Sequence, residues 1–314
     1  MLLLNRYPQA SAVGLALLAT LGFASKAIWI KLAYSHGAET LSLMNLRVLY
    51  SIPILLVVMY WIGFGWKDYA LSDLLAAAAL GLVGYYLASL LDLSGLAYIS
   101  ASYERMVLYL FPSLVVILSA LALKKRVGKR QWAAIAVSYA GVVLLFAGSA
   151  GRLGDHFYSG VGLVFASAVA FAVFMVASPV YIQRLGAMRF TLVAMLSSSL
   201  AVCVHFSIQV SWAVLAANSL AVHAYAMGLS VTASLIPAMM LSAATARLGA
   251  SHSSMIATLG PVMTLLLAWM VLKEQLAWHQ YAAALLVIAG ILLLRIPLPL
   301  PRRLSLRMFG VRFL

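Results

Sequence analysis

The sequence predicts an all-α membrane protein in which ten transmembrane helices form two inverted repeats of five. Three observations lead to this fold. The 314 residues are 65% hydrophobic and only 9% charged, with a mean hydropathy of +1.05. The second half of the chain repeats part of the first, and basic residues gather in the loops of one side. Soluble proteins carry about a quarter charged residues, so this composition fits a chain dissolved in lipid.

The internal repeat aligns Ala97–Leu145 with Ala246–Leu294 without gaps, at an offset of 149 residues, the interval from Pro112 to Pro261. A repeat of half the chain length indicates a duplication, and duplicated membrane bundles are common among secondary transporters. We therefore divide the chain into a first five-helix repeat at residues 1–150, a second, inverted five-helix repeat at 151–297 and a basic cytoplasmic tail at 298–314.

Long apolar runs without strand-like alternation predict helices, since only helices and closed barrels cross a membrane. The predicted spans, in chain order, are residues 11–33, 40–62, 73–92, 98–123, 131–149, 159–183, 190–209, 218–244, 250–272 and 279–296. The first run is long enough to remain as a span and is not read as a cleaved signal peptide. The single cysteine, Cys203, lies in an apolar run and allows no intrachain disulfide.

Loop charge predicts the orientation. With the N-terminus in the cytoplasm, the outer loops hold little beyond Arg152 and Lys273. The inner loops hold the tail and Arg6, Lys67, Lys124, Lys125, Arg126, Lys129, Arg130, Arg184, Arg189 and Arg247. This positive-inside pattern predicts both termini in the cytoplasm, at the bacterial cytoplasmic (inner) membrane. The net charge of +14 then reflects topology and gives no argument for nucleic-acid binding.

The two basic loops of the repeats also differ as inversion predicts. The loop 124–130 reads KKRVGKR, whereas its counterpart 273–279 reads KEQLAWH and has lost the basic excess. Only the cytoplasmic face selects for basic residues, so equivalent loops on opposite faces should diverge in this way. Inverted repeats place a substrate site near the middle of the membrane, between the halves.

Ionisable residues inside the spans of the first repeat mark the candidate site, because buried charge costs several kcal/mol unless it is paired or hydrated. They are Lys26, Arg47, Asp92, Glu104 and Arg105. A rise of about 1.5 Å per residue places four of them about 10 Å deep and Asp92 nearer the rim. The alternative is that they form structural ion pairs, with Glu104 paired to Lys26 or Arg47. Three cations against two anions suggest a substrate that carries a carboxylate or phosphate.

Helical spacing adds further candidates. Tyr85, Ser89 and Asp92 fall on one stripe of the third span, where an aromatic ring could stack on a flat substrate. Arg105, Tyr109 and Pro112 share one face of the fourth span with Ser102, and the ninth span repeats this face with Ser251, Ser254, Thr258 and Pro261. We expect each proline to lie inside its span and to free a carbonyl, on Leu108 and on Ala257, that needs another partner.

The predicted substrate-binding or gating residues are therefore Lys26, Arg47, Tyr85, Ser89, Asp92, Glu104, Arg105, Tyr109, Ser254 and Thr258, with helix kinks at Pro112 and Pro261. Matched prolines in two halves favour a transport pathway, and ordinary packing kinks are the alternative. The histidines His205, His223 and His252 lack metal-ligand spacing and are assigned to packing or hydrogen bonding, although His252 is a candidate for proton coupling. Gly81, Gly84, Gly141, Gly148 and Gly290 are assigned to close helix packing.

Several stretches resemble the EamA family of the drug/metabolite transporter superfamily. In the first half they are Ser25-Lys26 followed by Lys31, Leu46-Arg47, residues 85–89 (YYLAS) with Asp92, and residues 100–105 (SASYER). In the second half they are residues 248–251 (LGAS), 259–262 (LGPV) and 272–274 (LKE). The chain departs from the family's usual Gly-Glu at the end of the penultimate helix, where it has Lys273-Glu274, and Lys124-Lys125 in the first repeat lacks the acid.

The resemblance covers residues ~11–295 and implies a ten-helix inverted-repeat carrier that moves amino acids or other small organic compounds, often outward. We expect a secondary transporter, an exporter, that works by alternating access between the repeats. The alternative is an intramembrane enzyme or a membrane scaffold without transport activity, but no HExxH or GxGD motif supports an enzyme. No GxxxxGK[ST] motif occurs, so energy must come from a gradient of a proton or other ion, or from a partner. The expected partners are a small-molecule substrate and the lipid bilayer, with no cofactor and no metal.

Overall fold

The computed structural model describes residues 8–65, 69–123, 127–147, 156–257, 259–275 and 277–295, and the regular structure in these ranges is helical. In the first repeat the helices are α1 (Pro8–Ala24), α2 (Lys26–Ser35), α3 (Thr40–Trp61), α4 (Leu71–Gly81), the π-helical turn η3 (Leu82–Leu87), α5 (Ala88–Tyr98), α6 (Ala101–Leu108), α7 (Phe111–Leu123) and α8 (Lys129–Ala147). In the second they are α9 (Phe157–Leu185), α10 (Ala187–Gln209), α11 (Ala213–Ala217), α12 (Leu220–Ser230), the π-helical turn η4 (Val231–Leu235), α13 (Ile236–Ala257), α14 (Gly260–Leu272) and α15 (Trp278–Arg295).

Eight described helical segments are long and apolar enough to cross a membrane. They match the first eight predicted spans, although α1 and α2 meet at a break at Ser25 and the third span runs on to Tyr98. The last two predicted spans, 250–272 and 279–296, correspond to shorter apolar helices, Gly260–Leu272 and Trp278–Leu293. Length and composition therefore support eight of the ten predicted spans. The short helix α11 was not predicted.

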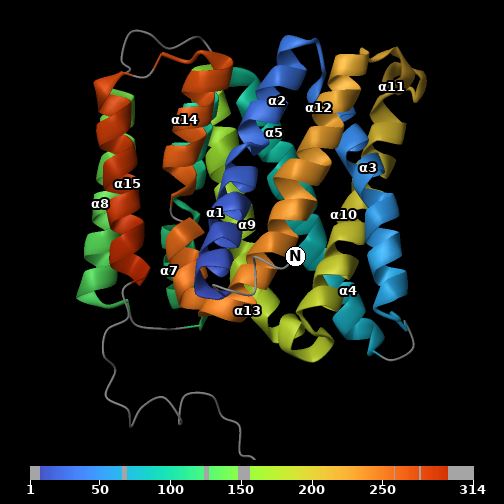
Figure 1. Ribbon diagram of the computed structural model, residues 1–314, viewed down its shortest axis with the longest axis horizontal. Coiled ribbons are helices and arrows are strands. Elements are labelled where there is room, and N and C mark those ends of the chain that lie inside the picture. The colour runs from blue at the N-terminus through green and yellow to red at the C-terminus, as the bar shows by residue number, and fades with distance from the viewer. Residues whose placement is uncertain are drawn as a thin grey trace, which may run out of the picture.

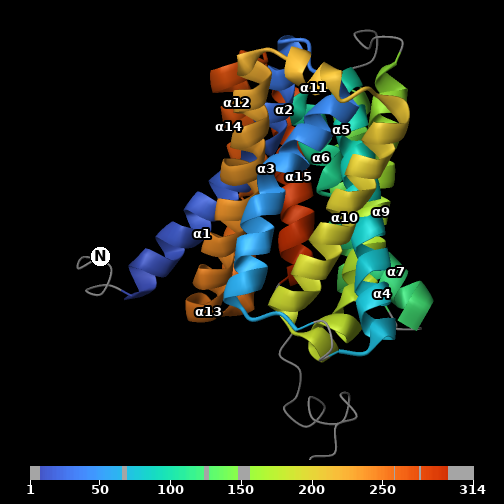
Figure 2. The ribbon, with the colours of Figure 1, turned by 90° about the vertical axis from the view of Figure 1, so that its right-hand side faces the viewer.

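Corresponding turns of the two halves lie at opposite ends of the bundle (Figure 1). Helix α7 ends and α8 begins at the lower edge, whereas α14 ends and α15 begins at the upper edge. In the perpendicular view α4 and α13 reach the lower edge and α11 lies at the upper edge (Figure 2). The start of α1 and the end of α15 both point to the lower edge, as the sequence predicts for termini on one side.

Two glycines make the contact between α8 and α15 symmetrical. A Cβ on Gly141 would lie 2.8 Å from the carbonyl oxygen of Ala283, and a Cβ on Gly290 would lie 2.7 Å from that of Ala134. Gly141 and Gly290 are equivalent positions in the repeat, and so are Ala134 and Ala283. Each helix therefore offers the same glycine and the same carbonyl to the other, which is the pattern of two antiparallel copies of one helix.

The prediction of close packing is confirmed at other glycines as well. A Cβ on Gly81 would lie 2.1 Å from the carbonyl oxygen of Ala194, and one on Gly84 would lie 2.3 Å from the ring of Phe174. Gly148 lies outside the described residues. Small residues let helix backbones approach closely where lipid provides no hydrophobic driving force between them.

Irregular backbone also recurs at equivalent positions. The π-helical turns begin at Leu82 and Val231, one repeat offset apart, and each widens the third helix of its half. Helices α6 and α13 end at Leu108 and Ala257, also one offset apart, and the helices that follow them both start three residues later, α7 at Phe111 and α14 at Gly260. Single-turn π-helices are frequent at functional sites, and their duplication indicates that both halves retain the same irregular scaffold.

The prolines begin helices and do not interrupt them. Pro112 is the second residue of α7 and Pro261 the second residue of α14. Pro112 lies inside the apolar span Ala101–Ala122, as expected, but this span is broken between Leu108 and Phe111, so the proline follows a break and does not kink one continuous helix. The first turn of a helix has no intrahelical acceptor for its N–H groups, so proline costs nothing there and favours the start of a helix. The chain uses the two prolines to restart a helix after a break within the membrane.

The symmetrical glycine contact gives a stability prediction. In Gly290→Ala the new Cβ would lie 2.0 Å from the hydroxyl of Ser138 and 2.7 Å from the carbonyl oxygen of Ala134, so α8 and α15 must separate. We expect a loss of about 1–3 kcal/mol, measured by thermal unfolding in detergent. Gly162→Ala in α9 is the control, because nothing lies within 4 Å of a Cβ there, and it should match the wild type. Equal melting temperatures for the two variants would contradict the symmetrical contact.

Candidate functional site

An ion pair between α2 and α5 forms the centre of the charged cluster. The ammonium group of Lys26 donates a hydrogen bond to Oδ2 of Asp92. The Asp92 side chain is 2% exposed and that of Lys26 is 23% exposed. Lys26 is the first residue of α2, just after the break at Ser25, so the break directs its side chain toward α5.

The position of Asp92 corrects the predicted depth. We expected Asp92 at the end of the third span, near the rim, but the helix continues from Ala88 to Tyr98 and leaves Asp92 buried. An unpaired carboxylate at this depth would be costly in lipid. The pair with Lys26 reduces that cost, since each charge compensates the other.

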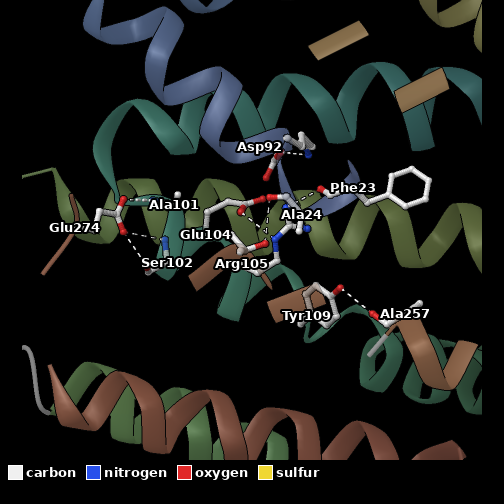
Figure 3. A network of polar contacts seen from close by, with 12 residues as sticks. Phe23, Ala24, Asp92, Ala101, Ser102, Glu104, Arg105, Tyr109, Ala257 and Glu274 are labelled. Atoms are coloured by element: carbon white, nitrogen blue, oxygen red, sulfur yellow. Dashed lines mark hydrogen bonds and ion pairs between the residues drawn. The ribbon is translucent and has the colours of Figure 1, made fainter. Parts of the chain in front are cut away.

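Glu104 and Arg105 lie beside this pair on α6 (Figure 3). Nε of Arg105 is 3.7 Å from Oε2 of Glu104, and both side chains are buried. Within the described residues neither carboxylate oxygen of Glu104 accepts a hydrogen bond. The predicted pairing of Glu104 with Lys26 or Arg47 is therefore wrong: Lys26 is taken by Asp92, and the ion-pair partner of Glu104 is its own neighbour in sequence.

Arg105 also closes the end of α1. Its Nη2 donates to the carbonyl oxygen of Phe23 at 3.2 Å, and the hydroxyl of Thr264 donates to the carbonyl oxygen of Ala24 at 3.2 Å (Figure 3). The break at Ser25 leaves these carbonyls without intrahelical partners, and a cation at the C-terminal end of a helix is electrostatically favourable. Arg105 thus joins α6 to α1, and Thr264 joins α14 to α1.

Arg47 stands apart from these pairs. Its Nη2 donates to the hydroxyl of Ser89 at 3.3 Å, and it makes no ion pair with any residue in the described ranges. Ser89 and Asp92 are three residues apart on α5, so Arg47 lies on the side of α5 that carries the Lys26–Asp92 pair. The cluster contains two cation–anion pairs, and Arg47 is the half-buried cation left over.

Tyr85 is not brought to the charged cluster. Its ring packs against Phe174 of α9, with ring centroids 5.0 Å apart, and it belongs to an apolar cluster among α4, α9 and α10. The predicted stripe of Tyr85, Ser89 and Asp92 assumed α-helical spacing. The π-helical turn η3 spans Tyr85 and takes more residues per turn, so it rotates Tyr85 away from the face of Ser89.

Tyr109 bridges the breaks of the two halves. Its hydroxyl donates to the carbonyl oxygen of Ala257 at 3.3 Å, and the Arg105 guanidinium lies 5.8 Å from its ring centroid. This is the carbonyl that was expected to lack a helical partner, and the partner is a side chain of the other repeat. A Cβ on Gly260 would lie 1.8 Å from the Tyr109 hydroxyl, so the glycine provides the space for this contact. The Ser254 side chain and all of Thr258 lie outside the described residues.

Two histidines link the repeats. The hydroxyl of Tyr50 lies 2.8 Å from Nδ1 of His223, whose Nε2 lies 2.9 Å from the carbonyl oxygen of Leu215. The hydroxyl of Tyr86 lies 2.9 Å from Nδ1 of His205. The hydrogen-bonding role predicted for these histidines is confirmed. The side chain of His252 lies outside the described residues.

Sequence analysis missed the role of Glu274. Its Oε1 accepts from the backbone N–H of Ala101 at 3.0 Å, and its Oε2 accepts from the hydroxyl of Ser102 at 2.6 Å and the N–H of Ser102 at 3.4 Å (Figure 3). The N-cap residue Ser100 makes no side-chain cap hydrogen bond, so a carboxylate from α14 caps α6 instead. The helix dipole favours this negative charge. The only sequence signal was the family's usual acid at this place, and its partner lies 173 residues away.

Lys273, next to this cap, has φ 56° and ψ 28°, the left-handed region, and is the one non-glycine residue with positive φ among those described. A residue with a side chain pays about 1–2 kcal/mol for this conformation, whereas glycine adopts it freely. The family's usual glycine at this position fits that geometry. The amide of Glu274 bonds back to the carbonyl oxygen of Ala268 at 3.2 Å, which fixes the turn and directs Glu274 toward α6.

The cap gives a second stability prediction. Glu274→Ala removes the acceptor for two backbone amides and one hydroxyl at the start of α6, and should lower stability by about 1–3 kcal/mol. Glu39→Ala is the matched control, because Glu39 is an exposed acid beside α3 whose side chain caps nothing. Thermal unfolding of both variants in detergent measures the difference. A Glu274→Ala melting temperature equal to that of Glu39→Ala would mean that the cap contributes nothing.

Comparisons with known proteins agree with this architecture. The model of the EamA-like transporter family matches residues 10–147 and again residues 158–296. The chain is similar to a Bacillus subtilis (strain 168) protein named "Uncharacterized transporter YcbK", with 26% identity over 276 residues, which cover 84% of this chain and 86% of the relative. A solved crystal structure resembles the fold with a TM-score of 0.63 at 17% identity, over 91% of this chain and 96% of the other.

The family match spans most of the chain and occurs once in each half, so both repeats are copies of the same family module. The chain belongs to the EamA-like transporter family, within the drug/metabolite transporter superfamily, and is a multi-pass membrane transporter.

Proposed function

We propose that this chain is a secondary transporter that exports a small organic metabolite bearing a carboxylate, such as an amino acid or a related compound. In this proposal ten spans form two inverted repeats of five, at residues 1–150 and 151–297, followed by the tail at 298–314, and both termini lie in the cytoplasm of a bacterial cell. Family membership and the recurrence of the same helix breaks in both halves support the proposal. A coupling proton or ion supplies the energy.

The leftover cation at Arg47 is the observation that carries the substrate class. Lys26 and Asp92 compensate each other, and so do Arg105 and Glu104. Among the described residues, Arg47 donates a hydrogen bond to the hydroxyl of Ser89 and forms no ion pair. A guanidinium inside a span that has no ion-pair partner in the described part of the chain favours binding of an anion, and its planar fork matches a carboxylate in two hydrogen bonds.

The other candidate residues take supporting roles in this proposal. The Lys26–Asp92 pair and Ser89 place the guanidinium of Arg47 on one side of α5. Arg105 and Tyr109 hold the ends of α1 and α13, next to the site, and act as positioning or gating residues. Tyr85 packs away from the charged cluster and would affect the site only indirectly, through the π-helical turn η3. Ser254 and Thr258 complete the pathway from the second repeat.

Alternating access follows from the duplicated breaks. Helices restarted at Pro112 and Pro261 consist of two shorter segments that can tilt separately. The two halves are inverted copies, so each half in the inward-open state would adopt nearly the conformation that the other half has in the outward-open state. The two states would therefore be similar in energy. A ligand shifts the populations of such states only through its different affinity for each of them.

The proposed orientation predicts cysteine accessibility. In a Cys203→Ser background, Gly128→Cys lies between α7 and α8 and Gln275→Cys lies after α14, and both positions are exposed. A membrane-impermeant maleimide added to intact cells should label Gln275→Cys and leave Gly128→Cys unmodified until the cells are opened. The reverse pattern would overturn the orientation, and equal labelling of both sites would overturn the inversion.

The role of Arg47 predicts the transport phenotype. Purified protein in proteoliposomes is assayed by counterflow with a panel of labelled amino acids and their methyl esters, which lack the carboxylate charge. Arg47→Ala should weaken the apparent affinity for the carboxylates roughly 10- to 100-fold, as expected for a lost charge-assisted hydrogen bond. Arg47→Lys keeps the charge but not the fork and should fall between Arg47→Ala and the wild type.

Arg184→Ala is the matched control for this assay. Arg184 is an exposed arginine that pairs with Asp73 at 2.8 Å, away from the charged cluster, and its loss should leave transport unchanged. If Arg47→Ala carries the carboxylates with wild-type affinity, the substrate assignment fails. If the wild type moves none of the panel while it remains folded, the proposal of an amino-acid-like cargo fails.

A further inference from the structure

A groove runs between α14 and α15 on the outside of the bundle. It encloses ≈ 200 Å³, and α14 contributes Val262, Leu265, Leu266 and Trp269 to its wall, while α15 contributes Tyr281, Ala284, Leu285 and Ile288. Its lining is almost wholly apolar. Leu266 and Leu285 are more than half exposed, so the groove opens toward the surroundings of the bundle and not toward its centre.

A second pocket of ≈ 410 Å³ lies at the end of the groove, around the last turn of α14. It is lined by Trp269, Met270, Lys273, Glu274 and Gln275. Trp269 lines both cavities, so this pocket continues into the apolar groove. Trp278, the first residue of α15, is also exposed. Tryptophan and tyrosine with one wet and one apolar side are typical of the membrane–water interface.

The charge of this pocket comes from Lys273. The carboxylate of Glu274 accepts three hydrogen bonds from the start of α6 and is attracted by the Lys31 ammonium, which leaves Lys273 as the exposed cation of the pocket. The Lys273 side chain is exposed and Gln275 adds an amide donor. Lys273 also holds a left-handed conformation that glycine would adopt without strain, on the side of the bundle that has few basic residues. Lys273 thus has a strained backbone conformation and lies on the side with few basic residues. We infer that its positive charge has a function in this pocket.

We propose that α14, α15 and the turn at Lys273 form a binding site for an anionic phospholipid. The phosphate of the headgroup pairs with the Lys273 ammonium and the Gln275 amide, Trp269 packs at the glycerol level, and one acyl chain lies in the groove between α14 and α15. Lysine binds phosphate as a point charge, and a cation near a membrane surface attracts anionic lipid. The site rests on the proposed function only for its assignment to the outer leaflet.

The experiment compares lipids and variants by thermal unfolding of the purified full-length chain in detergent. Dioleoyl-phosphatidylglycerol should raise the melting temperature more than dioleoyl-phosphatidylcholine does, and native mass spectrometry should find phosphatidylglycerol bound. Lys273→Gly should lose this preference, with roughly five-fold weaker binding, as expected for one lost charge at the membrane surface. Lys273→Arg should keep the preference.

The controls separate the lipid site from a folding defect and from a soluble-anion site. Glycine suits the left-handed turn, so Lys273→Gly without lipid should melt no lower than the wild type. Lys129→Ala removes an exposed lysine at the opposite edge of the bundle and should keep the lipid preference. Leu285→Trp fills the groove and should abolish the shift with phosphatidylglycerol.

Several results would overturn the site. Equal shifts with phosphatidylglycerol and phosphatidylcholine in the wild type would show that charge is not selected. An undiminished preference in Lys273→Gly would remove the lysine from the site, and an undiminished shift in Leu285→Trp would remove the groove. If sn-glycerol 3-phosphate, which has no acyl chain, stabilises the protein as well as the lipid does, the pocket binds a soluble phosphate instead. None of these results depends on transport, so the lipid site and the proposed function can fail separately.

Discussion

Lipid offers no hydrogen bonds to the backbone, so an interruption of a helix leaves backbone groups that need other partners, and at three helix ends in this bundle a side chain from elsewhere in the chain supplies them. Arg105 and Thr264 bond the carbonyls at the end of α1, Tyr109 bonds one at the end of α13, and Glu274 bonds the amides at the start of α6. Each of these side chains comes from a distant helix. The hydrogen bonds at these breaks therefore connect α1, α6, α13 and α14 to one another.

The backbone of the bundle is duplicated, whereas its charges are not. The π-helical turns, the restarted helices and the packing of α8 on α15 recur at equivalent positions in both halves. The two ion pairs of the charged cluster and the cation at Arg47 belong to the first half, among the described residues. A symmetrical scaffold thus carries an asymmetrical polar site. The symmetrical scaffold can support the exchange between inward-open and outward-open states, while the charged residues select the substrate.

Composition and the internal repeat predicted the helical class and most helix positions, because burial in lipid constrains every residue of a span. The family was identified from the resemblance of short motifs in both halves. The charged groups of Asp92, Glu104 and Arg105 lie together (Figure 3), as expected because a charge in lipid requires a compensating charge, and Lys26 pairs with Asp92. Their pairing was not predicted, because it depends on helix rotation, which sequence spacing does not specify. The π-helical turn, invisible in the sequence, rotated Tyr85 out of the expected stripe. Glu274 was missed because its partners lie in the other half of the chain.

The contact between α8 and α15 has a consequence for how such a chain can arise. Gly141 of one helix meets the carbonyl of Ala283, and Gly290 of the other meets that of Ala134, so the contact is isologous although it lies within a single polypeptide. In an unfused ancestor one glycine and one alanine per subunit would have satisfied both contacts of an antiparallel homodimer. Such a subunit must insert into the membrane in both directions, which a strong basic bias in any loop would prevent. Fusion of two copies would remove that restraint, and loops at opposite ends of the bundle, such as KKRVGKR and KEQLAWH, could then diverge in charge.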